Sequence, residues 1–345
     1  MRYTNLGNSG LIVSRLSFGS MTFGDGEGPV GSVYKVDAKG ADTLVGQALD
    51  AGINFFNSAD VYAHGRSEEM LGKALRKRRR DVVIATKVGN RIAGGSLLDS
   101  GLSRRHIIAS AERSLKRLGT DWIDVYLTHR FDPDTPVEET LAAFDHLVSS
   151  GKVRQIGYSN WPAWTVAKAA AIQQARGYEP FRAAEVYYSL VGRDIEVDTV
   201  PTARDAGIGL MIWSPLAGGF LSGKYKREDP KGGGNDRLAG FDILPFDRER
   251  GFQVVDALRD IAGAHHASPA QVAIAWVLSK GVASVIVGAS RPDQLADNLG
   301  AIDLALDGDE IARLDASYPP PVFYPNWLND GILADRVAQE ALAAK

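Results

Sequence analysis

Eight short, almost continuously apolar segments alternate with helix-like stretches along most of this 345-residue chain. Near-continuous hydrophobicity is typical of parallel strands covered on both faces, and the intervening helices indicate crossover connections. The pattern predicts a (β/α)8 barrel, or TIM barrel, that occupies residues 1–345 as a single domain, with a doubly wound parallel sheet as the alternative. The expected strands are 16–20, 53–58, 82–88, 123–129, 153–160, 183–189, 209–215 and 283–290.

Three segments depart from this alternation. An early hairpin, with Asn8 and Gly10 near its turn, precedes the first strand and is expected to close the bottom of the barrel. The Gly-rich, charged stretch 216–250 is too long for a routine connection, so we expect a flap over a bound ligand. The tail, 318–336, is rich in proline and aromatic residues and is expected to run over the barrel surface or its mouth.

Composition excludes several functional classes. The chain has no cysteine, which removes disulfides, zinc-thiolate sites, iron–sulfur clusters and cysteine nucleophiles. A net charge of −3 gives no global attraction to nucleic acid or to a membrane surface, and no apolar run is long enough to span a bilayer. The six histidines lack metal-ligand spacing, so no metal is expected. We therefore expect a cytoplasmic protein with small-molecule partners, and leave a homo-oligomer open.

Polar residues stand at the ends of three successive expected strands. Asn57 ends the second, with Tyr62 just beyond it; Lys87 lies in the third, and His129 ends the fourth. Each alone has an ordinary structural interpretation, such as a cap or a hydrogen-bonded core residue, and for one residue that interpretation is the commoner. The C-terminal strand ends of a barrel converge, however. Together the residues predict a site where a phenol donates a proton, a cation lowers its pKa from about 10, and an imidazole orients a substrate oxygen.

Longer motifs extend this site into a family pattern. They are "GINFFNSADVYAHGRSEEMLGKAL", "YLTHRFDPDTPVEETL", "GKVRQIGYSNW", "WSPLAGGFLSGKY" and "VIVGASRPDQLADNLGA". With them the chain resembles the aldo-keto reductase superfamily, in the branch of potassium-channel β subunits and related bacterial reductases. The resemblance implies a (β/α)8 barrel that binds a nicotinamide cofactor without a Rossmann domain. It also implies that Tyr62 is the proton donor, that Lys87 lowers its pKa, and that His129 orients the substrate.

Two positions depart from the family pattern. Asn57 replaces an aspartate, which leaves Lys87 without its usual carboxylate. Either Lys87 stays charged and acidifies Tyr62 more strongly, or burial removes its proton and Tyr62 becomes a poor acid. Glu185 replaces a glutamine that binds the nicotinamide carboxamide. Its charge could favour the oxidised cofactor and partly restore the negative charge lost at Asn57; in the alternative, Glu185 points elsewhere and is structural.

The remaining cofactor contacts follow from the strand ends and from the resemblance. Ser159 and Asn160 are placed at the nicotinamide carboxamide, Trp213 at the nicotinamide ring, and Arg291 at a 2′-phosphate, which favours NADP(H) over NADH. The full set of expected cofactor-binding residues is Ser20, Met21, Ser159, Asn160, Glu185, Trp213, Ser214, Pro215, Leu216, Gly218, Lys224, Arg237, Gly288, Ser290, Arg291, Gln294 and Asn298.

These features favour an NADP(H)-dependent oxidoreductase that interconverts a carbonyl and an alcohol. Two alternatives stay open: a cofactor-binding regulatory subunit with slow turnover, and an enzyme that acts mainly as an alcohol or sugar dehydrogenase. The side chains expected to wall the substrate mouth are Met21, Phe23, Tyr34, Trp161, Tyr188, Tyr324 and Trp327.

Overall fold

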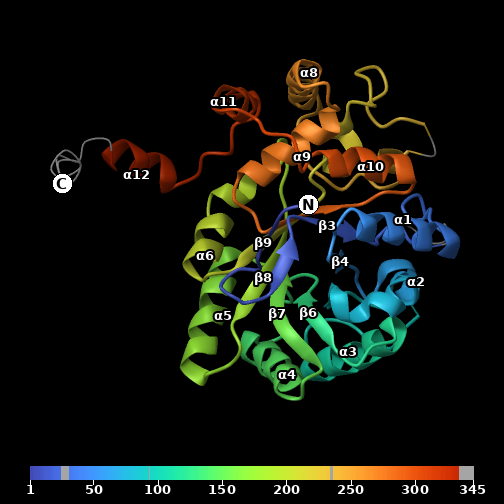
Figure 1. Cartoon of the computed structure of the whole chain (residues 1–345). Helices are drawn as coiled ribbons and strands as arrows, with labels where there is room; N and C mark the ends of the chain where they lie inside the picture. The colour runs from blue at the N-terminus through green and yellow to red at the C-terminus, as the bar shows by residue number, and fades with distance from the viewer. Residues whose placement is uncertain (25–30, 93, 234–235, 334–345) are drawn as a thin grey trace.

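The computed structural model describes residues 1–24, 31–92, 94–233 and 236–333. Eight parallel strands form a closed barrel in the order β10-β3-β4-β5-β6-β7-β8-β9, with helices around it (Figure 1). This confirms the predicted (β/α)8 barrel, and the alternative prediction of a doubly wound sheet is wrong. Each strand overlaps a predicted segment: β3 (Leu16–Gly19), β4 (Phe55–Asn57), β5 (Val83–Val88), β6 (Ile123–Thr128), β7 (Val153–Ser159), β8 (Phe181–Tyr187), β9 (Gly209–Trp213) and β10 (Ser284–Val287).

The strands are apolar because their side chains are buried on both faces. Most residues of β3, β4, β5 and β6 are fully buried, and the outward-facing ones pack against the surrounding helices in one large core. The helices are α1 (Ala38–Asp50), α2 (Arg66–Leu75), α3 (Arg104–Leu118), α4 (Val137–Ser149), α5 (Ala163–Arg176), α6 (Thr199–Asp205), α7 (Arg237–Gly240), α8 (Arg248–Ala264), α9 (Pro269–Ser279), α10 (Pro292–Gly300), α11 (Gly308–Ser317) and α12 (Asn326–Leu333). Short 3-10 turns are η1 (Tyr62–Gly65), η2 (Arg76–Asp81), η3 (Asp194–Glu196) and η4 (Ala217–Ser222). No helix in the described ranges is long and apolar enough to cross a membrane.

An antiparallel hairpin closes the bottom of the barrel, as expected. Its strands are β1 (Tyr3–Asn5) and β2 (Ile12–Ser14). The turn is held where the chain enters β9, because the amide of Asn8 donates to the carbonyl of Gly207 at 2.7 Å. Gly7 has φ +55°, and a Cβ atom there would lie 2.6 Å from the Gly207 carbonyl oxygen, so this close approach requires glycine.

The C-terminal tail does not follow the expected course. Figure 1 shows α12 standing away from the barrel, beyond α11. Tyr324 is 75% exposed and Trp327 is 56% exposed, so neither walls the substrate mouth. Three consecutive prolines, 319–321, precede this segment, and proline favours an extended backbone that leads the chain away from α11. Residues 334–336 of the predicted tail lie outside the described part.

Several other residues expected at the mouth are packing residues. Phe23, Trp161 and Tyr188 are buried and contact other aromatic rings, with Trp161 against Phe181 and Tyr188 against Trp276. Their apolar character reflects the core, which a single sequence does not distinguish from a pocket wall.

Candidate active site

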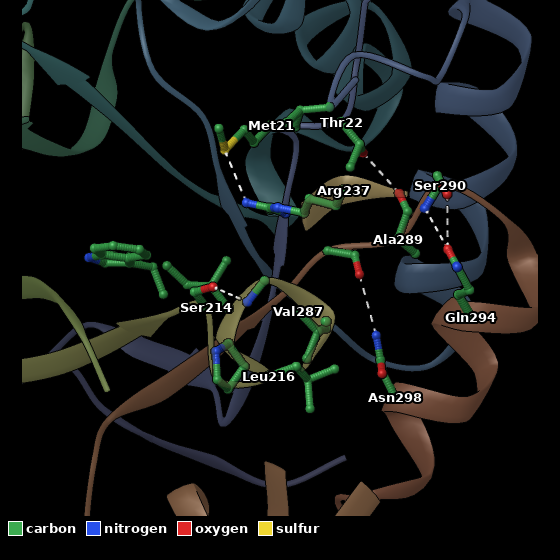
Figure 2. A pocket seen from close by; sticks show the side chains of 18 of the residues that line it. Met21, Thr22, Ser214, Leu216, Arg237, Val287, Ala289, Ser290, Gln294 and Asn298 are labelled. Atoms are coloured by element: carbon green, nitrogen blue, oxygen red, sulfur yellow. Dashed lines mark hydrogen bonds between the residues drawn. The ribbon is translucent and has the colours of Figure 1, made fainter. Parts of the chain in front are cut away.

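A cavity of about 560 Å³ opens at the C-terminal end of the barrel strands. This volume lies within the range of roughly 300–1,000 Å³ that is common for small-molecule sites. Residues at or just after the ends of β3, β4, β6, β7, β8, β9 and β10 line it, together with the first two turns of α10. Figure 2 shows this region, with Arg237 reaching toward Met21, and with Ser290, Gln294 and Asn298 at the α10 side.

Tyr62 is positioned by a tight turn that follows β4. The backbone at Ala63 and His64 has positive φ values of 45° and 57°, and Gly65 follows with φ 92°. The amide of Asp60 donates to the carbonyl of Lys87 at 3.1 Å, which fastens the turn to β5. Helix α2 begins directly afterwards. The turn therefore holds the phenol of Tyr62 beside Lys87 and at the cavity wall.

Lys87 lies at the centre of a buried polar cluster. Its Nζ donates to the Ser58 carbonyl at 2.7 Å and to Asn57 Oδ1 at 2.8 Å, and lies 3.4 Å from the Tyr62 hydroxyl. Glu185 Oε1, which comes from β8, is 3.1 Å from the same Nζ. Lys87 therefore has a carboxylate partner, and the expectation of an uncompensated cation is wrong.

Glu185 is joined to Asn57 as well as to Lys87. Its Oε2 accepts a hydrogen bond from Asn57 Nδ2 at 2.6 Å. The side chains of Lys87 and Glu185 are only 1% and 4% exposed. The interpretation in which Glu185 points away from the site is therefore wrong, and the negative charge missing at position 57 is supplied from β8.

The pKa values of this cluster decide between the two outcomes left open for Lys87. Burial lowers the pKa of Lys87, but Glu185 and Tyr62 raise it by more, so the ammonium stays charged. Burial also raises the pKa of Tyr62, and Glu185 adds to this, whereas Lys87 lowers it. Lys87 therefore lowers the pKa of Tyr62, as expected, but burial outweighs this effect and the net pKa lies above its ordinary value. Tyr62 holds its proton at neutral pH.

His129 follows β6 and faces Tyr62. Their rings meet edge to face with centroids 5.7 Å apart, and both residues line the cavity. Burial and the positive charges of Lys87 and Arg130 hold the pKa of His129 well below its ordinary value. The imidazole is therefore neutral at physiological pH and can donate one hydrogen bond without adding charge.

A hydrogen-bond chain fixes the side chains at the ends of β7 and β9. Ser159 Oγ donates to the Glu185 carbonyl at 2.7 Å, and Asn160 Nδ2 donates to Ser159 Oγ at 2.8 Å and to the His129 carbonyl at 3.0 Å. Trp213 Nε1 donates to Asn160 Oδ1 at 3.2 Å. These hydrogen bonds place an indole face, an amide and a hydroxyl together on the cavity wall, where a planar amide-bearing ring fits.

The segment after β9 forms a turn suited to anions. Ser214, Ala217, Gly218 and Gly219 all have positive φ, and the Gly218 amide donates to Ser214 Oγ at 3.0 Å. Consecutive amides in such turns can make concave anion-binding sites. Two cations stand nearby: Lys224 pairs with Asp236 at 2.5 Å, and the partly buried guanidinium of Arg237 contacts Met21 and Phe241. These residues of the predicted flap lie against the cavity; its residues 234 and 235 are outside the described ranges.

The far end of the cavity is formed by β10 and α10. Gln294 Oε1 accepts from the amide and the hydroxyl of Ser290, both at 3.0 Å, and Asn298 Nδ2 donates to the Gly288 carbonyl at 3.3 Å (Figure 2). The exposed side chain of Arg291 pairs with Asp293 at 3.0 Å. Polar groups and one helix N-terminus therefore meet where a phosphate-bearing ribose would fit.

The structure brings nearly all of the predicted residues to this cavity. Apart from Lys87, which lies behind Tyr62, and Ser20, all of the predicted catalytic and cofactor-binding residues line it, whereas Met21 alone of the residues predicted to wall the substrate mouth does so. Ser20 is buried, and its hydroxyl bonds to the Asn57 carbonyl and to Ser67. The expectation that its side chain contacts the cofactor is therefore wrong. Lining residues that the sequence reasoning missed include Thr22, Gly219 and Asp297, which adjoin predicted residues in the chain. No group of three or more metal-ligating side chains is placed to hold a metal within the described ranges.

Asp60, in the turn before Tyr62, gives a pH prediction. Within the described chain neither carboxyl oxygen has a hydrogen-bond partner, and burial, with nearby Glu68, raises the pKa of Asp60 from 3.8 to about 7. Between about pH 4 and pH 7, the folded protein therefore keeps a proton on Asp60 that the unfolded chain has lost. The free energy of unfolding should fall as pH rises between about 4 and 7, by up to about 1.4 kcal/mol per pH unit from this group.

Denaturant unfolding at several pH values tests this expectation. Asp60→Asn should flatten the dependence across that window, because the amide does not titrate. An identical pH slope in both proteins would contradict the assignment of this proton to Asp60.

Comparison with known proteins agrees with this fold and indicates a barrel oxidoreductase. The model of the aldo/keto reductase family matches residues 15–319. A probable voltage-gated potassium channel subunit beta of Arabidopsis thaliana is 38% identical, with 88% of this chain and 92% of that protein covered. Versiconal hemiacetal acetate reductase of Aspergillus parasiticus is 34% identical over 94% of this chain and 99% of its own, and an uncharacterized oxidoreductase of Bacillus subtilis is 36% identical over 93% and 97%. The chain belongs to the aldo/keto reductase family.

Proposed function

We propose that this protein is an NADP(H)-dependent oxidoreductase that interconverts an aldehyde or ketone with the corresponding alcohol. The observation that carries the proposal is the arrangement of Tyr62, His129 and Lys87. A protonated phenol and a neutral imidazole face one cavity, with a charged lysine directly behind the phenol. The names of two relatives, a reductase and an oxidoreductase, support the same class of reaction.

The cavity residues fit a nicotinamide dinucleotide. Ser159, Asn160 and Trp213 would hold the nicotinamide end, the turn 214–219 the pyrophosphate, and the start of α10 the adenosine end. When bound, the cofactor supplies or accepts the hydride. This chain's own residues have the task of binding it and of moving the proton.

Proton transfer is the task of Tyr62. In the reductive direction its hydroxyl gives a proton to the carbonyl oxygen as the carbonyl carbon gains a hydride, and the product is an alcohol. The phenolate left behind is stabilised by the ammonium of Lys87 at 3.4 Å. His129, being neutral, can donate a hydrogen bond to the same oxygen and hold the carbonyl in line.

Turnover of NADPH with a panel of aldehydes and ketones tests the proposal, with absorbance of the reduced cofactor as the readout. We expect saturable oxidation of NADPH that depends on the carbonyl compound. Binding of NADPH without carbonyl-dependent oxidation would overturn it.

The similarity to channel β subunits favours one second candidate, a cofactor-binding regulatory subunit with slow turnover. The same assay separates the two, because that candidate binds NADPH tightly and consumes it slowly. The interpretation as mainly an alcohol or sugar dehydrogenase depended on a free charge at Glu185. Lys87 neutralises that charge, so this interpretation loses its support.

Preference for NADPH should depend on Arg291. Its Nε and Nη2 donate to the two carboxylate oxygens of Asp293 at 3.1 and 3.0 Å, so a 2′-phosphate must compete with that carboxylate. Asp293→Asn should lower the Kd of NADPH by up to about fivefold, the scale of one exposed ion pair, and leave NADH unchanged. Arg291→Ala should weaken the binding of NADPH and leave the binding of NADH unchanged. Titrations of cofactor fluorescence measure both, and equal effects on the two cofactors would contradict this role.

A further inference from the structure

The ion pair between Lys87 and Glu185 crosses the barrel. Lys87 is on β5 and Glu185 on β8, with β6 and β7 between them in the sheet order. Both side chains are almost completely buried, so the pair is shielded from solvent. Of the described residues, Glu185 alone provides a carboxylate to this lysine. A buried charge pair at this distance is costly to build unless its hydrogen bonds are satisfied, and here Asn57 satisfies the second carboxylate oxygen.

We propose that Glu185 is a positioning residue for proton transfer: its carboxylate, oriented by Asn57, is the counter-ion that holds Lys87 beneath the Tyr62 hydroxyl. The proposal rests on the proposed carbonyl–alcohol chemistry and goes beyond it, because it assigns to a β8 residue a task separate from contacting the cofactor. It also makes Asn57 and Glu185 one functional unit.

The hydrogen-bond geometry shows why the two residues act as a unit. Asn57 must turn its Nδ2 toward Glu185 Oε2 and its Oδ1 toward Lys87, because the ammonium can only donate. The three protons of Lys87 therefore have three close acceptors, and the Tyr62 hydroxyl at 3.4 Å is its most distant partner. The position of Lys87, and with it the field at the phenol, is set by these acceptors.

Exchanging the two side chains should preserve this arrangement. In Asn57→Asp/Glu185→Gln, the introduced carboxylate can accept from the lysine and from the introduced amide, so every donor keeps an acceptor and the net charge is unchanged. Glu185→Gln alone leaves the lysine without a carboxylate and brings two amides together. Asn57→Asp alone places two carboxylates on one lysine and against each other.

The pH dependence of reduction reports on this unit because the phenol must be protonated to act. Glu185 raises the pKa of Tyr62 and Lys87 lowers it; the other charged or titratable groups near the phenol are His129, Tyr34 and Arg237. Removing the Glu185 charge should move the alkaline limb of kcat to lower pH, and adding a charge at Asn57 should move it to higher pH. A neighbouring charge at this range shifts a pKa by about one unit or more, which sets the scale.

The test compares pH profiles of kcat and kcat/KM in four proteins: the natural chain, Glu185→Gln, Asn57→Asp, and the double variant. We expect the single variants to shift the alkaline limb in opposite directions by about one pH unit, and the double variant to return most of the shift and most of the lost kcat. An unmoved limb in Glu185→Gln, or a double variant with the summed losses of both singles, would overturn the proposal.

A second readout keeps this test separate from the proposed function. Tyrosinate absorbance of each protein, measured against the same protein carrying Tyr62→Phe, gives the titration of Tyr62 without turnover. If the titration shifts in the expected order while no carbonyl compound is reduced, the positioning role stands and the proposed reaction fails. If turnover occurs and the titration does not move, the positioning role fails.

Glu196→Gln is the matched control. Glu196 follows the same strand and pairs with Arg193 at 2.7 Å, away from Lys87. This change also removes a paired carboxylate, yet it should leave the pH profile and the Tyr62 titration unchanged. Should Asn57→Asp fail to fold, as judged by circular dichroism, Glu185→Gln and the double variant still decide the question.

Discussion

Tyr62→Phe is expected to lower kcat for carbonyl reduction by roughly 10²–10⁴-fold, the usual contribution of a positioned general acid. The ring keeps its edge-to-face contact with His129, so the change removes a proton donor and little packing. Cofactor affinity should be unchanged, because the phenol lies beside Lys87 and the turn 214–219, proposed to bind the pyrophosphate, lies elsewhere in the cavity. Steady-state kinetics and a cofactor titration measure the two quantities separately.

Tyr187→Phe is the matched control for this variant. The Tyr187 hydroxyl bonds to Ser189 at 2.9 Å and its ring packs on Trp213, so the same atom is removed from a half-buried tyrosine close to the site. We expect a change in kcat much smaller than that of Tyr62→Phe. Comparable losses in the two variants would contradict the assignment of Tyr62 as proton donor.

Lys87→Met should have the second large effect, on activity and on stability together. It removes the cation that stabilises the phenolate, and it leaves the Glu185 carboxylate buried without a counter-ion. Breaking a buried ion pair by removing one partner typically costs about 3–5 kcal/mol. We therefore expect a decrease of that size in the free energy of unfolding, measured in denaturant near neutral pH, with reduction almost lost.

Lys87→Met/Glu185→Gln separates the two effects. Removing the orphaned carboxylate should recover a large part of the stability, because no buried charge is left unpaired. It should recover no activity, since the cation behind Tyr62 is still missing. A double variant as unstable as Lys87→Met would show that Glu185 does not carry the cost.

The barrel could be predicted from the sequence because its strands are buried on both faces. Segments such as 209–215 and 283–290 carry continuous apolar runs without a period of two, and that pattern suits central parallel strands better than any other element. The course of the tail could not be predicted in this way. Tyr324 and Trp327 are apolar enough for a core, but the chain before them leads outward, and aromatic composition alone does not report exposure.

The site was predictable in its members and less so in its contacts. Asn57, Lys87 and His129 stand at strand ends, and the rule that such ends converge places them together. The pairing of Lys87 with Glu185 depends on side-chain direction across the barrel, which strand order alone does not give. The sequence did carry a signal. Compared with the family pattern, a negative charge is missing at Asn57 and an extra one is present at Glu185, so that the two changes cancel in net charge.

The net pKa of Tyr62 was not predictable from neighbouring charges. Lys87 lowers it, as the sequence indicated, yet burial raises it by more. The depth of a phenol below the surface is a property of the folded chain, and it decides the sign here.

The most direct test of the proposed function is isotope transfer from NADPH carrying deuterium at both C4 positions to a reactive aldehyde. Mass spectrometry of the alcohol then shows where the label lies. We predict one deuterium on the carbinol carbon, one alcohol formed for each NADPH consumed, and loss of both in Tyr62→Phe. Tightly bound NADPH with no labelled alcohol would contradict the account, and would leave a cofactor-binding protein on a reductase barrel.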